Sequence, residues 1–131
     1  AVIRKQGTDL TIVAFGRMVH EALDAAEQLK DVGLNVEVID ARSVQPFDTA
    51  TVVASIKKTH RALIVHEAVK FGGIGAEITA QIQEEAFDYL DAPIMRVAAP
   101  FSPLPFSPAL EKLYIPNAAG IVAKVKETLE L

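Results

Sequence analysis

The sequence contains no cysteine and no tryptophan among its 131 residues. The absence of cysteine excludes disulfide bonds, a thiol nucleophile and cysteine-ligated zinc. Basic residues are also scarce, because 13 Lys and Arg stand against 17 Asp and Glu, for a formal net charge of −4. This balance argues against nucleic-acid binding, which needs concentrated positive charge. No apolar run approaches the roughly 18 residues of a membrane span. We therefore expect neither nucleic acid nor a membrane as a partner.

The start of the chain lacks an initiator methionine and the apolar core of a signal peptide, since it reads AVIRKQ. The length suits one domain, long enough to bury roughly two-thirds of its unfolded surface. We expect residues 1–131 to be a single domain, a fragment of a longer protein, in the cytoplasm.

Two hydrophobic periodicities alternate along the chain. Short apolar runs predict buried strands at residues 10–15, 34–39, 62–65 and 94–97. Apolar residues at three- and four-residue spacing predict helices whose buried stripes are 18–29, 52–56, 74–90 and 121–129. Asp48 and Asn117 are expected N-caps, and Gly33 is an expected helix stop. Strands alternating with helices predict an α/β fold, with a largely parallel sheet covered on both faces.

Six of the seven prolines lie between Pro93 and Pro116. The segment from Pro100 to Pro108 is therefore expected to be neither helix nor central strand. It should run over the surface in an extended form, and an ordered loop of this length is more often an interface than a linker.

A glycine cluster, Gly72, Gly73 and Gly75, follows the third predicted strand and opens a helix. A phosphate cradle would lie at such a position. The dinucleotide fingerprint, however, needs a glycine where Ile78 stands, and no Gly-Lys-Ser/Thr of a P-loop is present. The cluster has two interpretations: close approach of the helix to another backbone, which we favour, or binding of a small anion.

His66 and Glu67 follow the same predicted strand, at the edge of the sheet where α/β proteins bind ligands. A zinc-binding helix would need a second histidine four residues on, where Lys70 stands. A lone histidine at this place is more often hydrogen-bonded and structural. Serine chemistry lacks its Gly-x-Ser-x-Gly elbow.

An acidic group, formed by Glu84, Glu85, Asp88 and Asp91, lies on and after the third predicted helix. Such a group is usually a solvated face, and the alternative is a docking surface for a basic partner. Taken together, the residues supply no self-sufficient active site.

An ordered series of motifs resembles one known family. The motifs are VIDARSVQPFD (38–48), SIKKTHR (55–61), VHEA (65–68), GGIGAE (72–77), FDYLDAPI (87–94), PLPF (103–106) and LYIP (113–116). In this order they resemble the C-terminal, transketolase-like domain of the beta subunit of thiamine-diphosphate-dependent 2-oxo acid dehydrogenases. The pyruvate, branched-chain 2-oxo acid and acetoin dehydrogenases share this domain, and the resemblance covers essentially the whole chain.

The resemblance implies a three-layer domain with a mostly parallel five-stranded sheet and one antiparallel edge strand. It implies that thiamine diphosphate and magnesium belong to the whole enzyme and lie between the alpha subunit and the N-terminal domain of the beta subunit, so none is expected in this chain alone. It also implies two contacts for this domain: with a second beta subunit in an alpha2-beta2 tetramer, and with the dihydrolipoyl acyltransferase core.

We assign these contacts to residues as hypotheses. The interface candidates are His66, Glu67, Gly72, Gly73 and Gly75. The docking candidates are Glu84, Glu85, Asp88, Asp91 and the carboxylate of Leu131. The function expected is assembly and docking within an oxidative decarboxylase that transfers acyl groups to lipoyl groups. The alternative is a free-standing α/β interaction module that binds a small anion at residues 72–75.

Overall fold

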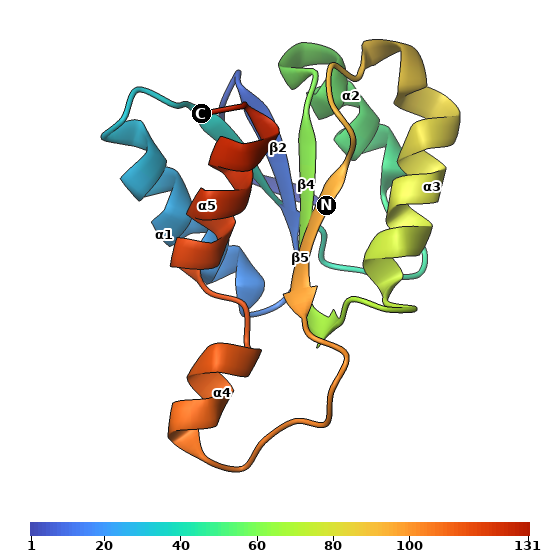
Figure 1. Cartoon of the computed structure of the whole chain (residues 1–131). Coiled ribbons are helices and arrows are strands. Elements are labelled where there is room, and N and C mark those ends of the chain that lie inside the picture. Colours follow the sequence, from blue (N-terminus) through green and yellow to red (C-terminus); the bar gives the residue numbers. More distant parts are fainter.

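The computed structural model describes all of residues 1–131, and Figure 1 shows a central sheet between two pairs of helices. The elements are β1 (Val2–Lys5), β2 (Leu10–Ala14), α1 (Met18–Lys30), β3 (Val36–Asp40), α2 (Thr49–Thr59), β4 (Ala62–Val69), α3 (Ile74–Ala86), the 3-10 turn η1 (Phe87–Tyr89), β5 (Met95–Ala99), α4 (Pro108–Tyr114) and α5 (Ala118–Thr128). No helix is both long and apolar enough to cross a membrane.

The five strands form one sheet in the order β1-β3-β2-β4-β5. The β3–β2, β2–β4 and β4–β5 pairs are parallel, and β1 pairs with β3 in the antiparallel sense. This confirms the expected mostly parallel five-stranded sheet with one antiparallel edge strand. The carboxyl ends of the four parallel strands consequently lie along one edge of the sheet.

Side-chain alternation along the strands builds a separate core on each face of the sheet. In β2, Leu10 and Ile12 point into a core closed by α1 and α5, whereas Val13 points into a core closed by α2 and α3. In β4, Leu63 and Ile64 divide between the two cores in the same way. Strands buried on both faces are continuously apolar, which is why these runs are recognisable in the sequence.

The capping residues and the glycine stop that the sequence predicts are found at the helix ends. The Asp48 carboxylate accepts from the Thr51 amide (3.1 Å) at the start of α2, and the Asn117 side chain accepts from the Gly120 amide (2.9 Å) at the start of α5. Gly33, after α1, has φ +81°, a conformation that glycine adopts without steric cost.

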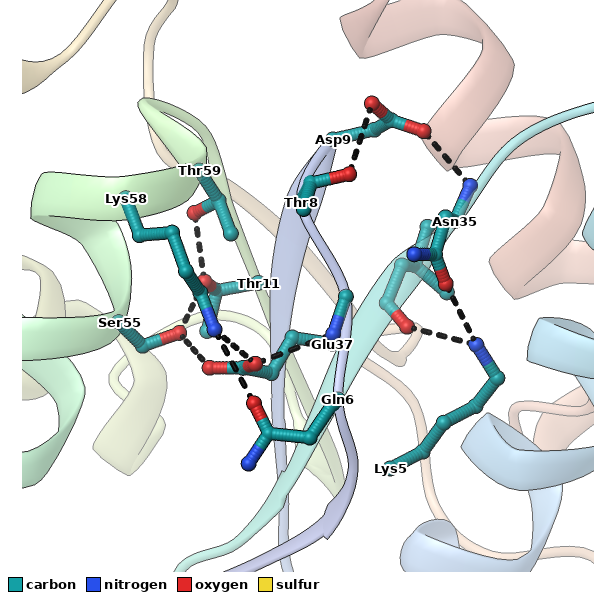
Figure 2. Close-up of polar contacts among 12 residues, drawn as sticks. Lys5, Gln6, Thr8, Asp9, Thr11, Asn35, Glu37, Ser55, Lys58 and Thr59 are labelled. Atoms are coloured by element: carbon teal, nitrogen blue, oxygen red, sulfur yellow. Dashed lines mark hydrogen bonds and ion pairs between the residues drawn. The ribbon is translucent and has the colours of Figure 1, made fainter.

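A buried polar network joins the sheet to α2 near the amino ends of the strands (Figure 2). Glu37 of β3 is fully buried, and its carboxylate accepts from the Ser55 hydroxyl (2.6 Å) and the Gly7 amide (3.1 Å). Lys58 supplies the compensating charge, and Thr11 bonds to the Ser55 hydroxyl. A buried carboxylate is tolerated only when it is paired and hydrogen-bonded in this way.

Several boundaries differ from the sequence-based prediction. β1 is largely exposed and carries no hydrophobic periodicity, so only the family resemblance implied a fifth strand. β4 continues to Val69, four residues beyond the predicted end at Val65, because its last residues pair with β5. His66 and Glu67 therefore lie inside a strand and not after it. Helix α3 ends at Ala86, and Leu90 follows the 3-10 turn.

The proline segment is irregular over residues 100–107, but Pro108 opens helix α4, which the sequence-based prediction missed. The expectation that Pro108 lies outside any helix was wrong, because proline is well tolerated in the first helical turn, where its missing N–H has no partner to lose. No residue of α4 is buried, and Figure 1 shows the helix standing away from the sheet.

Candidate functional site

The carboxyl edge of the parallel strands gathers the chain's irregular segments. The turn after β4 carries Lys70 and the glycine cluster, and the segment after β5 carries the prolines and leads into α4. Backbone bonds tie the two together, since the Lys70 amide donates to the Ala99 carbonyl (2.8 Å). In Figure 1 both segments lie at the same end of the sheet. This edge is where parallel α/β sheets form binding sites.

The His66 ring fills the space between β4 and the start of α3. A Cβ atom on Gly75 would stand 2.8 Å from His66 Nε2, and one on Gly73 would stand 2.8 Å from His66 Cε1 and collide with the Val69 carbonyl. Only glycine lets the helix begin this close to the strand. Packing therefore accounts for both glycines, in line with the interpretation as a close approach of backbones.

The partners of His66 define its tautomer. Its Nδ1 lies 3.1 Å from the Ala68 carbonyl, which can only accept, so Nδ1 carries the proton and Nε2 keeps a lone pair. Nε2 is buried and has no hydrogen-bond partner. Burial lowers the pKa of the imidazole below its usual 6.5, and the charge of Arg96 lowers it further. His66 is thus neutral, and it packs in the interior against the start of α3.

The other interface candidates do reach the surface. Glu67 follows His66 in β4, points away from it and is exposed. Gly72 is exposed as well and has φ +69°, which lets the chain turn from β4 into α3. The structure brings His66, Gly73 and Gly75 into contact, and leaves Glu67 and Gly72 free for contact with a partner.

The docking candidates fall into two separate places. Glu84 and Glu85 lie in the last turn of α3, Asp88 lies in the 3-10 turn, and Asp91 follows it, all of them exposed. Leu131 is exposed beyond α5, which covers the opposite face of the sheet from α3 (Figure 1). Within one chain these carboxylates form two groups and no single cluster.

Sequence reasoning missed a cavity at the carboxyl edge. It has a volume of about 560 Å³, and its walls include Lys70, Phe71, Arg96, Phe101 and Leu113. The two phenylalanine rings meet with centroids 5.1 Å apart and a tilt of 55°. Two features of the sequence could have indicated the cavity. Phe71 stands beside a glycine in a turn and Phe101 stands among prolines, and a ring in either place is hard to bury.

Comparison with known proteins identifies the family to which this domain belongs. The family model of the transketolase C-terminal domain matches residues 1–121. The chain belongs to the transketolase C-terminal domain family. Among curated relatives, the pyruvate dehydrogenase E1 component subunit beta of Staphylococcus aureus is 48% identical over 130 residues, and that of Bacillus subtilis (strain 168) is 44% identical over 130 residues. The match covers 99% of this chain and 40% of each relative, so this transketolase C-terminal domain spans two-fifths of their length.

Solved structures agree with the family assignment. A split-gene transketolase, in an inactive beta4 tetramer, superposes with a TM-score of 0.81 at 32% identity, over 99% of this chain and 41% of that one. The 2-oxoglutarate:ferredoxin oxidoreductase from Magnetococcus marinus gives a TM-score of 0.60 at 17% identity, over 98% of this chain and 20% of that one, and shows the fold alone.

The chemistry open to this transketolase C-terminal domain is limited by its side chains. No three His, Asp or Glu side chains lie close enough together to hold a metal ion. Nε2 of the one buried histidine, His66, has no hydrogen-bond partner.

Proposed function

We propose that the chain is the C-terminal domain of the beta subunit of the decarboxylating component of a 2-oxo acid dehydrogenase complex. In that setting the whole enzyme oxidatively decarboxylates a 2-oxo acid such as pyruvate and transfers the acyl group to lipoyl groups. The observation that carries the proposal is the 44–48% identity, over 99% of this chain, with pyruvate dehydrogenase E1 beta subunits.

The cofactor would lie outside these residues. A diphosphate–magnesium pair needs carboxylate or amide oxygens grouped around the metal, and no such group of acidic side chains exists in this chain. The first turn of α3 is closed by the His66 ring against Gly73 and Gly75, which leaves no cradle for a diphosphate. The residues of this domain therefore do not fit thiamine diphosphate.

Two features support a role in assembly. At the start of α3, Gly72 and Glu67 are exposed, and a second beta subunit can contact this surface. At the other end of α3, Glu84, Glu85 and Asp88 offer acceptors to a basic module of the acyltransferase core. The alpha subunit would complete the enzyme through the parts of the beta subunit that this chain does not include.

The experiment is to express the complete reading frame with a companion alpha subunit and to assay decarboxylation of pyruvate, branched-chain 2-oxo acids and acetoin with an artificial electron acceptor. Thiamine-dependent turnover by the pair supports the proposal, and its absence with every substrate and at least two companion alpha subunits contradicts it.

The isolated chain provides the matching binding test. Calorimetric titration with thiamine diphosphate and magnesium should show no binding, and micromolar affinity would place the cofactor site in this domain after all. The alternative, a module that binds a small anion at residues 72–75, predicts saturable binding of phosphate in the same cell, which Gly72→Ala should reduce.

A further inference from the structure

The cavity between the turn after β4 and the segment after β5 is lined by groups that the proposed function does not use. Phe71 and Phe101 touch each other, yet they remain 75% and 76% exposed. Leu113 of α4, which closes the same cavity, is 82% exposed. Aromatic rings that leave this much apolar area in water are typical of interaction sites.

The charge of this cavity has one sign. Lys70 and Arg96 line it, and its walls contain no aspartate or glutamate. Neither side chain takes part in an ion pair, although the chain as a whole is acidic. Arg96 is held in place, because its Nη1 donates to the Lys70 carbonyl (3.1 Å). The two cations are therefore unpaired and lie beside an apolar surface.

A second cavity of about 240 Å³ continues the first one, since both include Pro100 and Leu113 in their walls. Its other walls are two further prolines, Leu110, Tyr114 and Ser102, so it is mostly apolar and suits an apolar side chain. The Tyr114 hydroxyl donates to the Ser102 carbonyl (3.0 Å) and ties α4 to the segment after β5. The two cavities thus form one groove, bounded by the turn after β4, the segment after β5 and α4.

We infer that this groove binds an extended polypeptide segment of a partner protein, with a carboxylate side chain at Lys70 and Arg96 and an apolar side chain in the cavity walled by proline. Side chains two residues apart on an extended segment lie on one face, about 6.6–6.8 Å apart, so a carboxylate and an apolar side chain of one short segment can face the groove together. The inference goes beyond the proposed function, which assigns no role to the residues of this groove.

Charge complementarity favours a partner over a second copy of the chain. In a two-fold contact a residue faces its own copy only near the axis, so a contact centred on this groove would set Lys70 and Arg96 of one copy against the same cations of the other. Like charges facing each other in an interface are unfavourable. A nucleic acid is disfavoured as well, because two cations on a chain of net charge −4 give too small a basic footprint.

The test uses the complete protein that contains this chain and an array of blocked hexapeptides, with Asp or Glu at position 2, Phe, Tyr, Leu or Met at position 4, and Ala or Ser elsewhere. We expect the best peptide to bind in calorimetry with a Kd of about 100 μM or below. Its Asn or Gln counterpart should bind about tenfold more weakly, as should the Lys70→Glu and Phe101→Ser variants, because each loses a charge-assisted or aromatic contact.

Two exposed residues outside both cavities provide matched controls. Lys112→Glu makes the same charge change on α4, and Phe106→Ser removes a fully exposed ring from the same proline segment. Both should leave affinity within about twofold, a free-energy difference of about 0.4 kcal/mol.

Four results would overturn the inference: no peptide of the array binding below 1 mM, equal binding of the acidic and amide peptides, equal losses in the control variants, or a dimer in sedimentation that Phe101→Ser dissociates. The last result would assign the surface to a second copy of the chain. Circular dichroism of each variant verifies that the fold is intact.

Discussion

The ring of His66 occupies the volume that a side chain at Gly75 would need. The Nε2 atom would lie 2.8 Å from a Cβ at that position, closer than real contacts of this kind, and Arg96 Cδ would lie 3.3 Å away on another side. A strand residue, a helix residue and a residue of the next strand therefore fix one another, and the orientation of α3 against the sheet depends on the absence of a methyl group.

Gly75→Ala should lower the free energy of unfolding by about 1–3 kcal/mol, because overpacking the contact with His66 outweighs the helix propensity gained. Urea denaturation measures the change. Gly120→Ala is the matched control, since its Cβ would meet only the Asn117 side chain at an ordinary 3.5 Å, and it should be neutral or stabilising by up to about 1 kcal/mol.

A double-mutant cycle tests whether contact with the His66 ring causes the stability loss of Gly75→Ala, and not a general intolerance of α3 to substitution. In a His66→Ala background the added methyl has room, so the Gly75→Ala cost should shrink by about 0.5–3 kcal/mol in a double-mutant cycle. An unchanged cost would mean that the ring is not the group that excludes the side chain.

Stability should fall below neutral pH because of His66. Burial lowers its pKa in the folded state, so the unfolded chain takes up a proton first as the pH drops below about 6.5. The free energy of unfolding therefore declines from that pH down to the folded-state pKa, below which this contribution levels off. Urea unfolding at a series of pH values between 8 and 5 should show the decline, and a His66→Gln variant should have a smaller slope over the same range.

Much of the fold could be predicted because each element carries a local signal. Ile12 and Ile64 sit in runs that are apolar throughout, and Asp48 and Asn117 mark helix starts by their capping oxygens. β1 carries no such signal, because an exposed edge strand gains its structure from backbone pairing with β3 alone. Helix α4 was missed for a similar reason, since its residues bury nothing and its only marker is a proline in the first turn.

The ion pair between Lys58 and the buried Glu37 yields a prediction about removal of the lysine. Burial by itself would raise the pKa of Glu37, but hydrogen bonds from Lys58, Ser55 and the Gly7 amide, together with the charge of Lys58, bring the pKa below its usual value. Its contribution to stability is thus present above about pH 4.5 and is lost as the pH falls towards the lower folded-state pKa.

Lys58→Met should lower the free energy of unfolding at pH 7 by about 1–3 kcal/mol, because it leaves a buried carboxylate without its cation. The value stays below that of a fully buried pair, since the lysine is 42% exposed and water screens it. Lys57→Met, one residue earlier on the exposed face of α2, should change stability by less than about 1 kcal/mol. Equal losses in the two variants would show that the pairing with Glu37 is unimportant.

The candidate site was predicted less completely than the fold. The sequence placed His66 and the glycines at one edge of the sheet, because strand ends and helix starts are local features. It could not show that Lys70, Phe71 and Phe101 share a cavity, since that proximity depends on how the turn after β4 packs beside the segment after β5. Contacts between segments 30 residues apart follow from tertiary packing and not from any local pattern.

The acidic end of α3 yields the last prediction. Glu84 and Glu85 lie in the final turn of the helix, where the carbonyl ends carry partial negative charge, and this turn contains no basic residue. Carboxylates at that position are unfavourable for the helix, so replacement of both by glutamine should stabilise the fold by a few tenths of a kcal/mol for each residue. If these carboxylates dock the acyltransferase core, the same double variant should weaken binding of the assembled enzyme to that core, most at low salt, where charge attraction is least screened. Thermal unfolding and calorimetry then change in opposite directions, whereas Asp24→Asn and Glu27→Gln, at exposed positions of α1, serve as controls of equal charge. A solvated face without a partner would give the stability gain and an unchanged affinity at every salt concentration, which would remove this end of α3 from the docking surface.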